Sequence, residues 1–291
     1  LIGNYGINLE DMESDGIKVR GFIVREKCDL PSNFRCELEL EDFLKQGKVI
    51  GLEGIDTRAL TKIIRNNGTK RGIITLENVS LQDVQSKLEE HCNKDSVKNV
   101  TRKEIENIKG TGAKVVVIDF GVKNIVLESL KACNCDITIV PAMTTVEEIL
   151  NINPDLILLS NGPGNPEDIN DIVENIKKLI GKKPLTGIGL GHQILALALG
   201  GKTSKLVFGH RGGNHPVKCL ETGKVFITSQ NHGYNVSEMP ENTEVTHINL
   251  NDNTIEGMRH KELPIYSVQY IPEYTTKEDL DCIFNKFLAL I

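Results

Sequence analysis

In the first third of the chain, apolar and polar residues alternate over short segments, and apolar residues recur at helical spacing in two other segments. Apolar and polar residues partly alternate over residues 17–24 and 71–76, which predicts half-buried strands. A helix is predicted between them, because Asp56 is a good N-cap and Asn67-Gly68 tolerates the left-handed conformation that ends helices. A second helix is predicted over residues 81–91. We therefore expect a mixed α/β domain in this part of the chain.

The pattern changes after the polar stretch 93–109. Short, wholly apolar strands then alternate with helices, which is typical of a parallel sheet covered on both faces. The predicted strands are residues 115–118, 137–140, 156–159 and 185–188, and the predicted helices are residues 122–131, 145–150 and 167–180. Further strands and turns are predicted over residues 225–268, and a closing helix over residues 276–290.

These patterns predict an α/β protein of two domains. A mixed α/β domain is expected at residues 1–100, followed by a linker at residues 101–112. The second domain, residues 113–291, is expected to hold a mainly parallel sheet flanked by helices. A length of 291 residues agrees with two packed domains.

Composition narrows the possible partners. A hydrophobic content of 39% with a net charge of -6 describes an ordinary globular protein without the basic excess of a nucleic-acid binder. The longest apolar runs fall far short of the ~20 residues that span a bilayer, so no membrane partner is expected. Seven cysteines without metal-ligand spacing are expected to be reduced thiols, and no metal site is predicted. We expect a cytoplasmic location, because no signal peptide is visible and reduced thiols fit a reducing compartment. The chain does not start with Met, so an incomplete N-terminus is expected and an organellar location is left open.

Two glycine-rich turns follow predicted strands, where the sites of α/β sheets gather. One is residues 160–164, Ser-Asn-Gly-Pro-Gly, and the other is residues 187–193, Gly-Ile-Gly-Leu-Gly-His-Gln. The second has the frame G-x-nucleophile-x-G, in which a tight turn lifts one residue above the sheet, and the lifted residue is Gly189. A dinucleotide-binding loop would need a third glycine where this chain has His192, and a merely tight turn is the other alternative.

The sequences of these two turns resemble those of a known family. G-I-G-L-G-H-Q is similar to the G-I-C-L-G-H-Q elbow of class I glutamine amidotransferases, and S-N-G-P-G-N-P to their oxyanion loop. F-G-H-R-G-G-N-H-P-V at residues 208–217 and T-S-Q-N-H-G-Y at residues 228–234 resemble the small subunit of carbamoyl-phosphate synthetase. I-G-N-Y-G at residues 2–6 and G-I-D-T-R-A-L-T at residues 54–61 extend the resemblance over essentially the whole chain.

The resemblance implies a role for individual residues. In the family the small subunit hydrolyses glutamine and passes ammonia to a large subunit, so the expected partners are glutamine and that large subunit. No cofactor is implied in this chain, because ATP and magnesium would be used by the large subunit. The oxyanion hole is expected from the N–H groups of Gly162 and Leu190. The residues expected to bind glutamine are Gly162, Gly164, Gln193, Asn231, Gly233 and Tyr234.

For some of these residues a structural role is the alternative. Gln193 could be a polar residue in the first turn of a helix, and residues 231–234 an ordinary Asn/Gly loop. His192 and His232 are expected to be hydrogen-bonded structural residues, because the family gives them no part in proton transfer.

The chain departs from the family at the positions that perform the reaction. The family has its nucleophilic Cys at the position of Gly189 and its general base His at that of Ile271, in the motif Q-Y-I-P-E at residues 269–273, whose Glu273 remains as the third member. Glycine offers no side-chain nucleophile and isoleucine carries no proton to exchange. Ile125 and Glu128 also stand where the family usually has Asn and Arg. We therefore predict that glutamine hydrolysis is lost.

Three functions are compatible with these departures. The chain could serve as a stabilising, tunnel-capping or regulatory small subunit for a large subunit that uses free ammonia. It could instead be a pseudoenzyme that binds glutamine without hydrolysing it, or an altered copy of an active glutaminase subunit. Because glycine adopts positive φ without strain, Gly189 is expected to preserve the turn while removing the chemistry.

Overall fold

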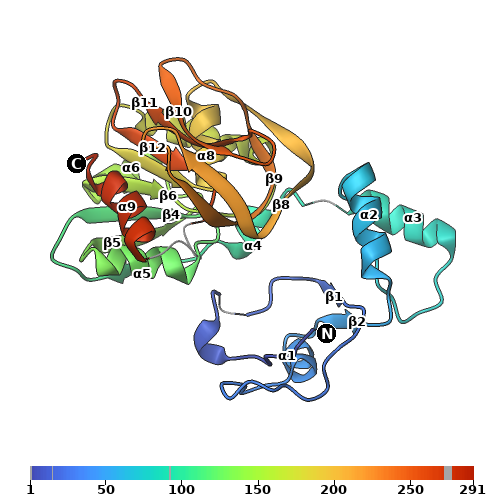
Figure 1. Ribbon diagram of the computed structural model, residues 1–291. Helices are drawn as coiled ribbons and strands as arrows, with labels where there is room; N and C mark the ends of the chain where they lie inside the picture. The colour runs from blue at the N-terminus through green and yellow to red at the C-terminus, as the bar shows by residue number, and fades with distance from the viewer. Residues whose placement is uncertain (1, 15, 92, 272–276) are drawn as a thin grey trace. The chain divides into compact units, whose positions relative to one another are not determined.

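The computed structural model describes residues 2–14, 16–91, 93–271 and 277–291. The chain divides into two compact units, Leu1–Cys92 and Asn93–Ile291, each with its own sheet (Figure 1). The segment expected to be a linker, residues 101–112, differs from that expectation because it contains strand β3, Glu106–Ile108, which pairs with β5 of the second unit. Three mostly polar residues on a sheet edge leave no hydrophobic pattern by which to predict a strand.

The first unit consists of short elements. They are η1 Leu9–Asp11, β1 Gly21–Ile23, α1 Leu40–Gln46, β2 Ile50–Leu52, α2 Thr57–Asn67 and α3 Leu81–Glu90. Strands β1 and β2 pair in parallel. The predicted helix boundaries are confirmed for α2, since the Asp56 carboxylate accepts a hydrogen bond from the Ala59 N–H at 3.0 Å and Gly68 ends the helix with φ 77°.

One strand prediction in the first unit is wrong and another is too long. Residues 71–76 form no regular element, and only Gly21–Ile23 of the predicted 17–24 is a strand. The Arg71 guanidinium instead donates to the carbonyls of Leu88 and Glu89 at the end of α3, at 2.7 and 3.1 Å. A helix end leaves such carbonyls without helical partners, so Arg71 caps α3 instead of joining a sheet.

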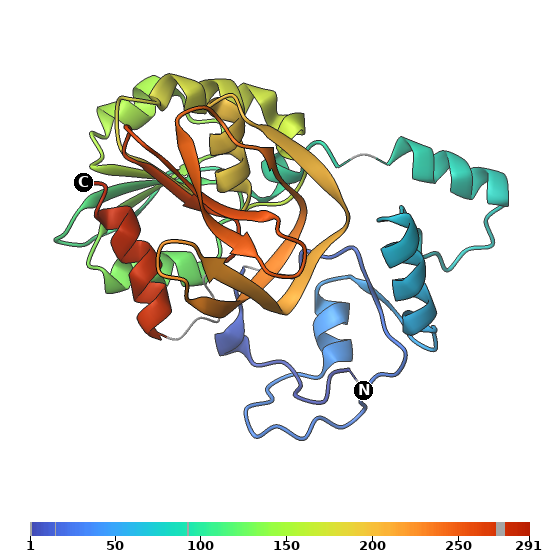
Figure 2. The ribbon, with the colours of Figure 1, turned by 45° about the horizontal axis from the view of Figure 1, so that its top comes forward.

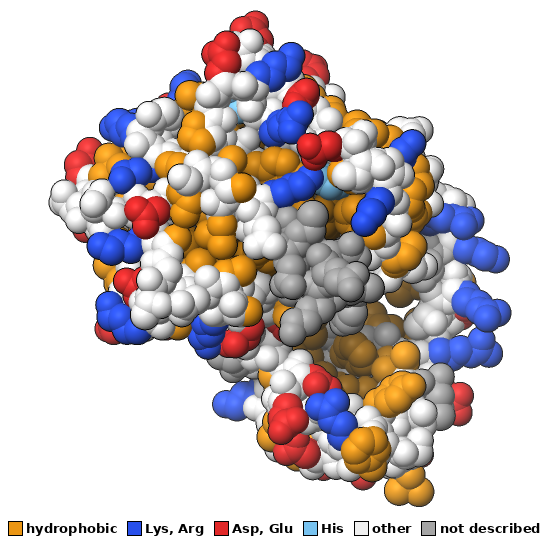
Figure 3. Space-filling model, turned by 60° about the vertical axis from the view of Figure 1, so that its left-hand side comes forward, with side chains coloured by type: hydrophobic (Ala, Val, Ile, Leu, Met, Phe, Trp, Pro, Cys, Tyr) orange, Lys and Arg blue, Asp and Glu red, His pale blue; other side chains and the backbone are white. Residues whose placement is uncertain are grey.

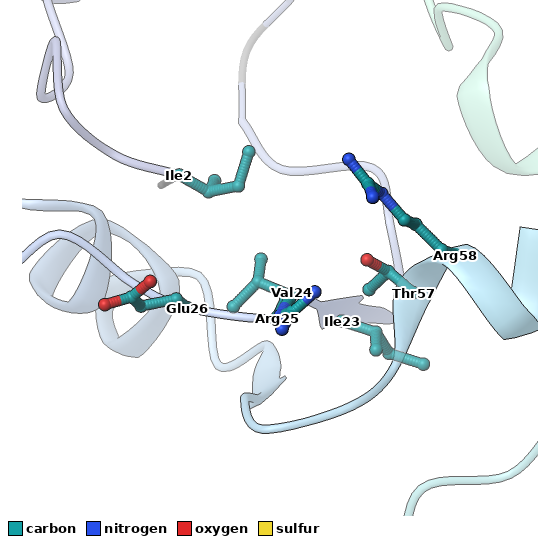
Figure 4. A pocket seen from close by; sticks show the side chains of 7 residues that line it. All are labelled: Ile2, Ile23, Val24, Arg25, Glu26, Thr57 and Arg58. Carbon is teal, nitrogen blue, oxygen red and sulfur yellow. The ribbon is translucent and has the colours of Figure 1, made fainter.

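A hollow of about 400 Å³ opens in the first unit beside the start of α2. Figure 4 shows the side chains around it, which are those of Ile2, Ile23, Val24, Arg25, Glu26, Thr57 and Arg58. Thr57 and Arg58 come from the first turn of α2 and Ile23 from β1, so two residues of the motif at residues 54–61 line this hollow.

The second unit is built on one sheet of ten strands in the order β3-β5-β4-β6-β7-β12-β11-β10-β8-β9. Five neighbouring strands, from β5 to β12 in that order, are parallel, and every other neighbouring pair is antiparallel. The strands are β3 Glu106–Ile108, β4 Lys114–Asp119, β5 Asp136–Pro141, β6 Leu156–Leu159, β7 Leu185–Ile188, β8 Lys202–Cys219, β9 Val225–Glu238, β10 Thr243–Asn249, β11 Ile255–His260 and β12 Ile265–Val268. The predicted α/β class is confirmed, with a sheet that is mixed rather than mainly parallel.

Helices cover both faces of the parallel part of this sheet, as Figures 1 and 2 show. They are α4 Ser96–Val100, α5 Asn124–Ala132, α6 Val146–Asn151, η2 Pro166–Ile169, α7 Asn170–Leu179, α8 Leu190–Ala198 and α9 Lys277–Leu288. Val116 and Ile118 of β4 pack in the core beneath α6, α7 and α8, whereas Val115 and Val117 pack in the core beneath α5 and α9. Successive side chains of β4 point to opposite faces of the sheet and therefore pack into two separate hydrophobic cores.

The long antiparallel strands β8 and β9 extend the sheet beyond the parallel part. In the upper part of Figure 3, Lys and Arg side chains lie among Asp and Glu side chains. Among the described residues, none of the helices is long and apolar enough to cross a membrane.

Candidate functional site

The turn between β7 and α8 has the geometry of an elbow. Gly189 alone separates Ile188 from Leu190 and adopts φ 57° and ψ -111°, a conformation that L side chains rarely adopt. Its N–H donates to the Val268 carbonyl at 2.9 Å, and its carbonyl accepts from the Gln193 N–H at 3.2 Å. The position predicted to hold a nucleophile is therefore presented at the start of α8, and it carries a glycine.

Two further glycines bring α8 directly onto the sheet. A Cβ on Gly191 would lie 2.1 Å from the Leu159 carbonyl oxygen, and one on Gly187 would lie 2.6 Å from the Gly191 carbonyl carbon. The Gly191 N–H also donates to the Ser160 carbonyl at 3.1 Å. Only glycine permits backbone to approach backbone so closely, so these two positions are required by packing.

Gly189 differs from these two glycines because it has space around it. A Cβ built there would lie 3.5 Å from Asn161 Cβ and 3.7 Å from the Gln269 carbonyl oxygen, which are ordinary van der Waals contacts. A side chain at this position would meet strain from the positive φ but no clash. It would lie beside the loop that follows β6 and the segment that follows β12.

The two residues predicted to form an oxyanion hole are neighbours. A Cβ on Gly162 would lie 2.9 Å from Leu190 Cδ2 and 2.5 Å from the Phe120 carbonyl oxygen, so the loop runs tightly against both segments. In the described part of the chain, no group accepts a hydrogen bond from the N–H of Gly162 or of Leu190. Gly164, further along the same loop, has φ 104°, and a Cβ there would lie 3.4 Å from Ser96 Cβ.

Buried side chains hold the loop after β6 in place. The Ser160 hydroxyl is fully buried, accepts from the Phe120 N–H at 2.9 Å and donates to the Asn161 carbonyl at 2.8 Å. The Asn161 amide donates to the Gly121 carbonyl at 2.9 Å and accepts from the Lys123 N–H at 3.3 Å. These bonds join the ends of β4 and β6, so the loop has a fixed position next to the elbow.

Gln193 lies in the first turn of α8 and is buried. Its amide nitrogen donates to the Tyr234 carbonyl at 2.8 Å and to the Gln269 side-chain oxygen at 2.9 Å. The side chain thereby joins α8 to β9 and to the end of β12. The sequence reasoning missed the role of Gln269, although this residue opens the motif at residues 269–273 that contains Ile271.

The other residues predicted to bind glutamine lie in β9. Residues 231–234 belong to this strand and not to a loop, and Asn231 pairs with Arg211 of β8. Asn231 is exposed, whereas Gly233 and Tyr234 are half-buried. Burial raises the pKa of Tyr234, and the nearby carboxylates of Asp168 and Glu167 raise it further, so this ring lies near the end of the loop after β6. The structure brings Tyr234 and Gln193 together.

The position of the predicted general base is apolar and buried. The Ile271 N–H donates to the Ser229 carbonyl of β9 at 3.2 Å, and 9% of the residue is exposed. Glu273, the third predicted member, lies outside the described residues. Of the two other departures, Ile125 packs at the edge of the core beneath α5, and Glu128 is exposed and pairs with Lys131 at 2.6 Å.

Both histidines near the elbow have structural surroundings. His192 is fully buried, its Nδ1 lies 2.8 Å from the Ser267 hydroxyl, and burial lowers its pKa to about 3. His232 lies 2.8 Å from the Tyr234 carbonyl through Nδ1, and burial lowers its pKa to about 4. Both imidazoles are therefore neutral at pH 7.

Comparison with known proteins gives consistent similarities. Residues 116–290 match the profile of the glutamine amidotransferase class-I family, and residues 1–74 match that of the carbamoyl-phosphate synthase small chain, CPSase domain. The chain is 60% identical over 289 residues to the carbamoyl phosphate synthase small chain of Clostridium perfringens, covering 99% of this chain and 83% of that protein. It is 47% identical over 294 residues to the pyrimidine-specific small chain of Bacillus subtilis, covering 100% of this chain and 81% of that one.

One solved structure supports the fold of the second unit. A Thermoplasma acidophilum structure named for GMP synthase aligns with a TM-score of 0.55 at 24% identity, covering 62% of this chain and 94% of that one.

The contact beneath the elbow can be tested by adding one methyl group. We expect Gly191→Ala to lower the free energy of unfolding by about 3 kcal/mol or more, because its Cβ would meet a backbone carbonyl that cannot move aside. Gly213→Ala, where a Cβ meets nothing within 4 Å, should stay within about 0.5 kcal/mol of the parent chain. Denaturant unfolding followed by circular dichroism measures both, and equal midpoints for the two variants would contradict the contact.

Proposed function

The chain belongs to the class I glutamine amidotransferases and, among them, to the carbamoyl phosphate synthase small chains, and we propose that it is a small subunit whose own glutamine hydrolysis is lost. Its large partner would then use free ammonia, and this chain would stabilise, cap or regulate that partner. The observation that carries the proposal is the glycine at the elbow. Gly189 has the backbone geometry of a presented nucleophile and no side-chain atom with which to attack.

The surroundings of Ile271 support the same proposal. A general base must accept a proton within hydrogen-bond reach of the group it activates. The Ile271 side chain is buried and carries no polar atom, and its backbone is pinned to β9 through the Ser229 carbonyl. The two positions expected to hold the nucleophile and the base therefore carry only a hydrogen atom, at Gly189, and a hydrocarbon side chain, at Ile271.

The other residues of the candidate site keep the arrangement that the proposal expects of a small subunit without hydrolysis. Gly162 and Leu190 lie next to each other, and neither N–H donates to a described group, so the two could stabilise a developing negative charge or hold a carbonyl group. This arrangement also favours the second candidate, a chain that binds glutamine without hydrolysing it. The Gln193 amide nitrogen is already engaged by Tyr234 and Gln269, so glutamine binding through that nitrogen would require these bonds to rearrange.

Glutaminase activity should be absent. When members of a catalytic triad are removed, turnover typically falls by ~10⁶-fold, and a remainder of ~10³ to 10⁴-fold over water persists from the oxyanion hole and binding. Ammonia released from glutamine by the purified chain should accordingly stay near background, in parallel with a glutaminase of measured turnover as the positive control. Turnover comparable to that control would sink the proposal. Glutamine binding measured by calorimetry on the same sample separates the two candidate functions.

Association with a large synthetase subunit should persist without glutaminase activity. The first unit belongs to the small-chain family and lacks the elbow, so its role does not depend on Gly189. A stable interface should bury at least ~1,000 Å² and survive size exclusion at micromolar concentration. If this chain and the large subunit of the same organism elute separately, the role as a synthetase subunit loses its support, whatever the glutaminase result.

Restoring both reactive groups should rescue hydrolysis in a non-additive way. Gly189→Cys alone introduces a thiol with a pKa near ~8.5, which is mostly protonated at neutral pH, and Ile271→His alone introduces a base with nothing to activate. The Cβ contacts at Gly189 are ordinary, so the thiol should fit, at a strain of about 1–3 kcal/mol from the positive φ. The double variant should exceed either single variant in ammonia release by about 10²-fold or more.

Each single variant is the matched control for the other. Alkylation by iodoacetamide shows whether the thiol of Gly189→Cys is accessible, and mass spectrometry shows whether a thioester forms with glutamine. If the double variant is alkylated and binds glutamine but forms no thioester, the loss extends beyond these two side chains.

A further inference from the structure

Three side chains that could bind a metal converge in the antiparallel part of the sheet, outside the elbow. His210 lies in β8, His232 in β9 and Glu256 in β11, and one ligand atom of each lies within 4.8 Å of the others. His210 is 4% exposed and Glu256 is fully buried. These residues stand far apart along the chain, so no spacing in the sequence indicates the cluster.

The outer nitrogen of each imidazole is already held by an acceptor. His210 Nε2 lies 2.8 Å from a carboxylate oxygen of Asp252, and His232 Nδ1 lies 2.8 Å from the Tyr234 carbonyl oxygen. Each outer nitrogen therefore carries the N–H, and in a neutral imidazole the inner nitrogen then carries a lone pair. Metal-binding histidines typically show this arrangement, with the second ring N–H donated to a carboxylate or a backbone carbonyl.

The Gln230 side chain lies between the two imidazoles and the Glu256 carboxylate. The Gln230 side-chain oxygen lies 2.9 Å from His210 Nδ1 and 2.8 Å from His232 Nε2, while the Gln230 nitrogen lies 2.9 Å from a Glu256 carboxylate oxygen. In this orientation the Gln230 oxygen faces the lone pair of the neutral His232. If the amide is reversed, its oxygen faces the Glu256 carboxylate instead. With His232 neutral, either orientation leaves two acceptors opposed, whether or not His210 is protonated, and a cation between them would remove the conflict.

Glu256 provides an independent sign of a missing partner. One of its carboxylate oxygens accepts from the Asn249 and Gln230 amides at 3.0 and 2.9 Å. The other oxygen, Oε2, is buried and has no hydrogen-bond partner among the described residues. A buried carboxylate is normally paired with a cation or fully hydrogen-bonded, so Oε2 is the atom of this carboxylate that a further cation could contact.

We propose that His210, His232 and Glu256 bind a divalent transition metal of the Zn²⁺ class, with the Gln230 side-chain oxygen as a fourth ligand. Two imidazoles and one carboxylate are a recurring zinc ligand set, with bonds of ~2.0–2.2 Å and ligand atoms ~3.3 Å apart. The inner nitrogen of His210 lies 3.5 Å from Glu256 Oε1, close to that separation, and small side-chain shifts would close the rest.

A proton competes with the metal at one of these ligands. Burial opposes charge on His210, but hydrogen bonds to Glu256 and Asp252 outweigh it and raise its pKa to about 9. Metal binding therefore has to release the proton on Nδ1 of His210, as it does at other imidazole ligands.

The proposed metal would also act on the candidate glutamine site. The Tyr234 carbonyl oxygen accepts from His232 Nδ1 and from the Gln193 amide nitrogen, each at 2.8 Å. A metal that fixes the His232 ring would thereby fix the backbone of residues 231–234 and the side chain at the start of α8. The metal is structural here, and the site stands independently of whether glutamine is hydrolysed.

Metal binding can be measured without any assay of activity. The full chain, stripped with a chelator and dialysed at pH 8, should bind one Zn²⁺ in competition with a chromophoric chelator. It should give the visible absorption of a four-coordinate site when Co²⁺ is added. His232→Gln and Glu256→Gln should each weaken Zn²⁺ binding by more than about 100-fold, and Asp252→Asn, which only orients His210, by about 10 to 100-fold. His91→Gln, an exposed histidine of the first unit, is the matched control and should bind as the parent does.

Circular dichroism of each variant identifies any that do not fold, in which case the parent Co²⁺ spectrum and the partly exposed Asp252→Asn still test the site. The proposal is overturned if the parent chain binds no Zn²⁺ at micromolar concentration. It is also overturned if folded His232→Gln and Glu256→Gln chains bind Zn²⁺ as tightly as the parent.

Discussion

The second unit depends on a contact between two stretches of backbone. The first turn of α8 lies so close to the end of β6 that the hydrogen atoms of Gly191 fill the space beside the Leu159 carbonyl. This approach sets the N-terminal end of the helix against the loop after β6, where its N–H groups carry a partial positive charge. Any larger residue would move the helix away and separate Leu190 from Gly162. The polar character of the site therefore follows from a packing requirement.

Holding the site together and performing chemistry in it are tasks of different residues. The loop is anchored by Ser160 and Asn161 through buried hydrogen bonds, and α8 is tied to β9 by Gln193. None of these bonds uses a side chain at position 189 or a polar group at position 271. The geometry of the unit consequently does not depend on a reactive side chain at either position, which is why membership of a fold family does not by itself establish a reaction.

Elements that depend on local sequence signals could be predicted accurately, whereas elements that depend on pairing between distant strands could not. The helix that starts after Asp56 and the apolar strand β6 follow from caps and runs of a few residues, so the sequence alone located them. The stretch at residues 71–76 alternates like a strand but finds no partner strand, and β3 is too short and too polar to be recognised. The elbow was recognisable because its residues are contiguous. The histidine and glutamate cluster was not, because it forms only when β8 pairs with β9 and β11 packs against β9.

The positive φ of Gly189 makes substitution to glycine at this position easier than substitution away from it. An ancestor with a side chain at the elbow would have borne the strain of that conformation, and its replacement by glycine would have relieved it. Returning to a larger residue would require the chain to accept the strain again, before a base exists nearby to make the new side chain useful. With stabilities of only 5–15 kcal/mol for most domains, a strain of about 1–3 kcal/mol is a considerable barrier to selection. If glutamine hydrolysis is lost as proposed, one substitution is enough to lose it, and fewer than two would not restore it.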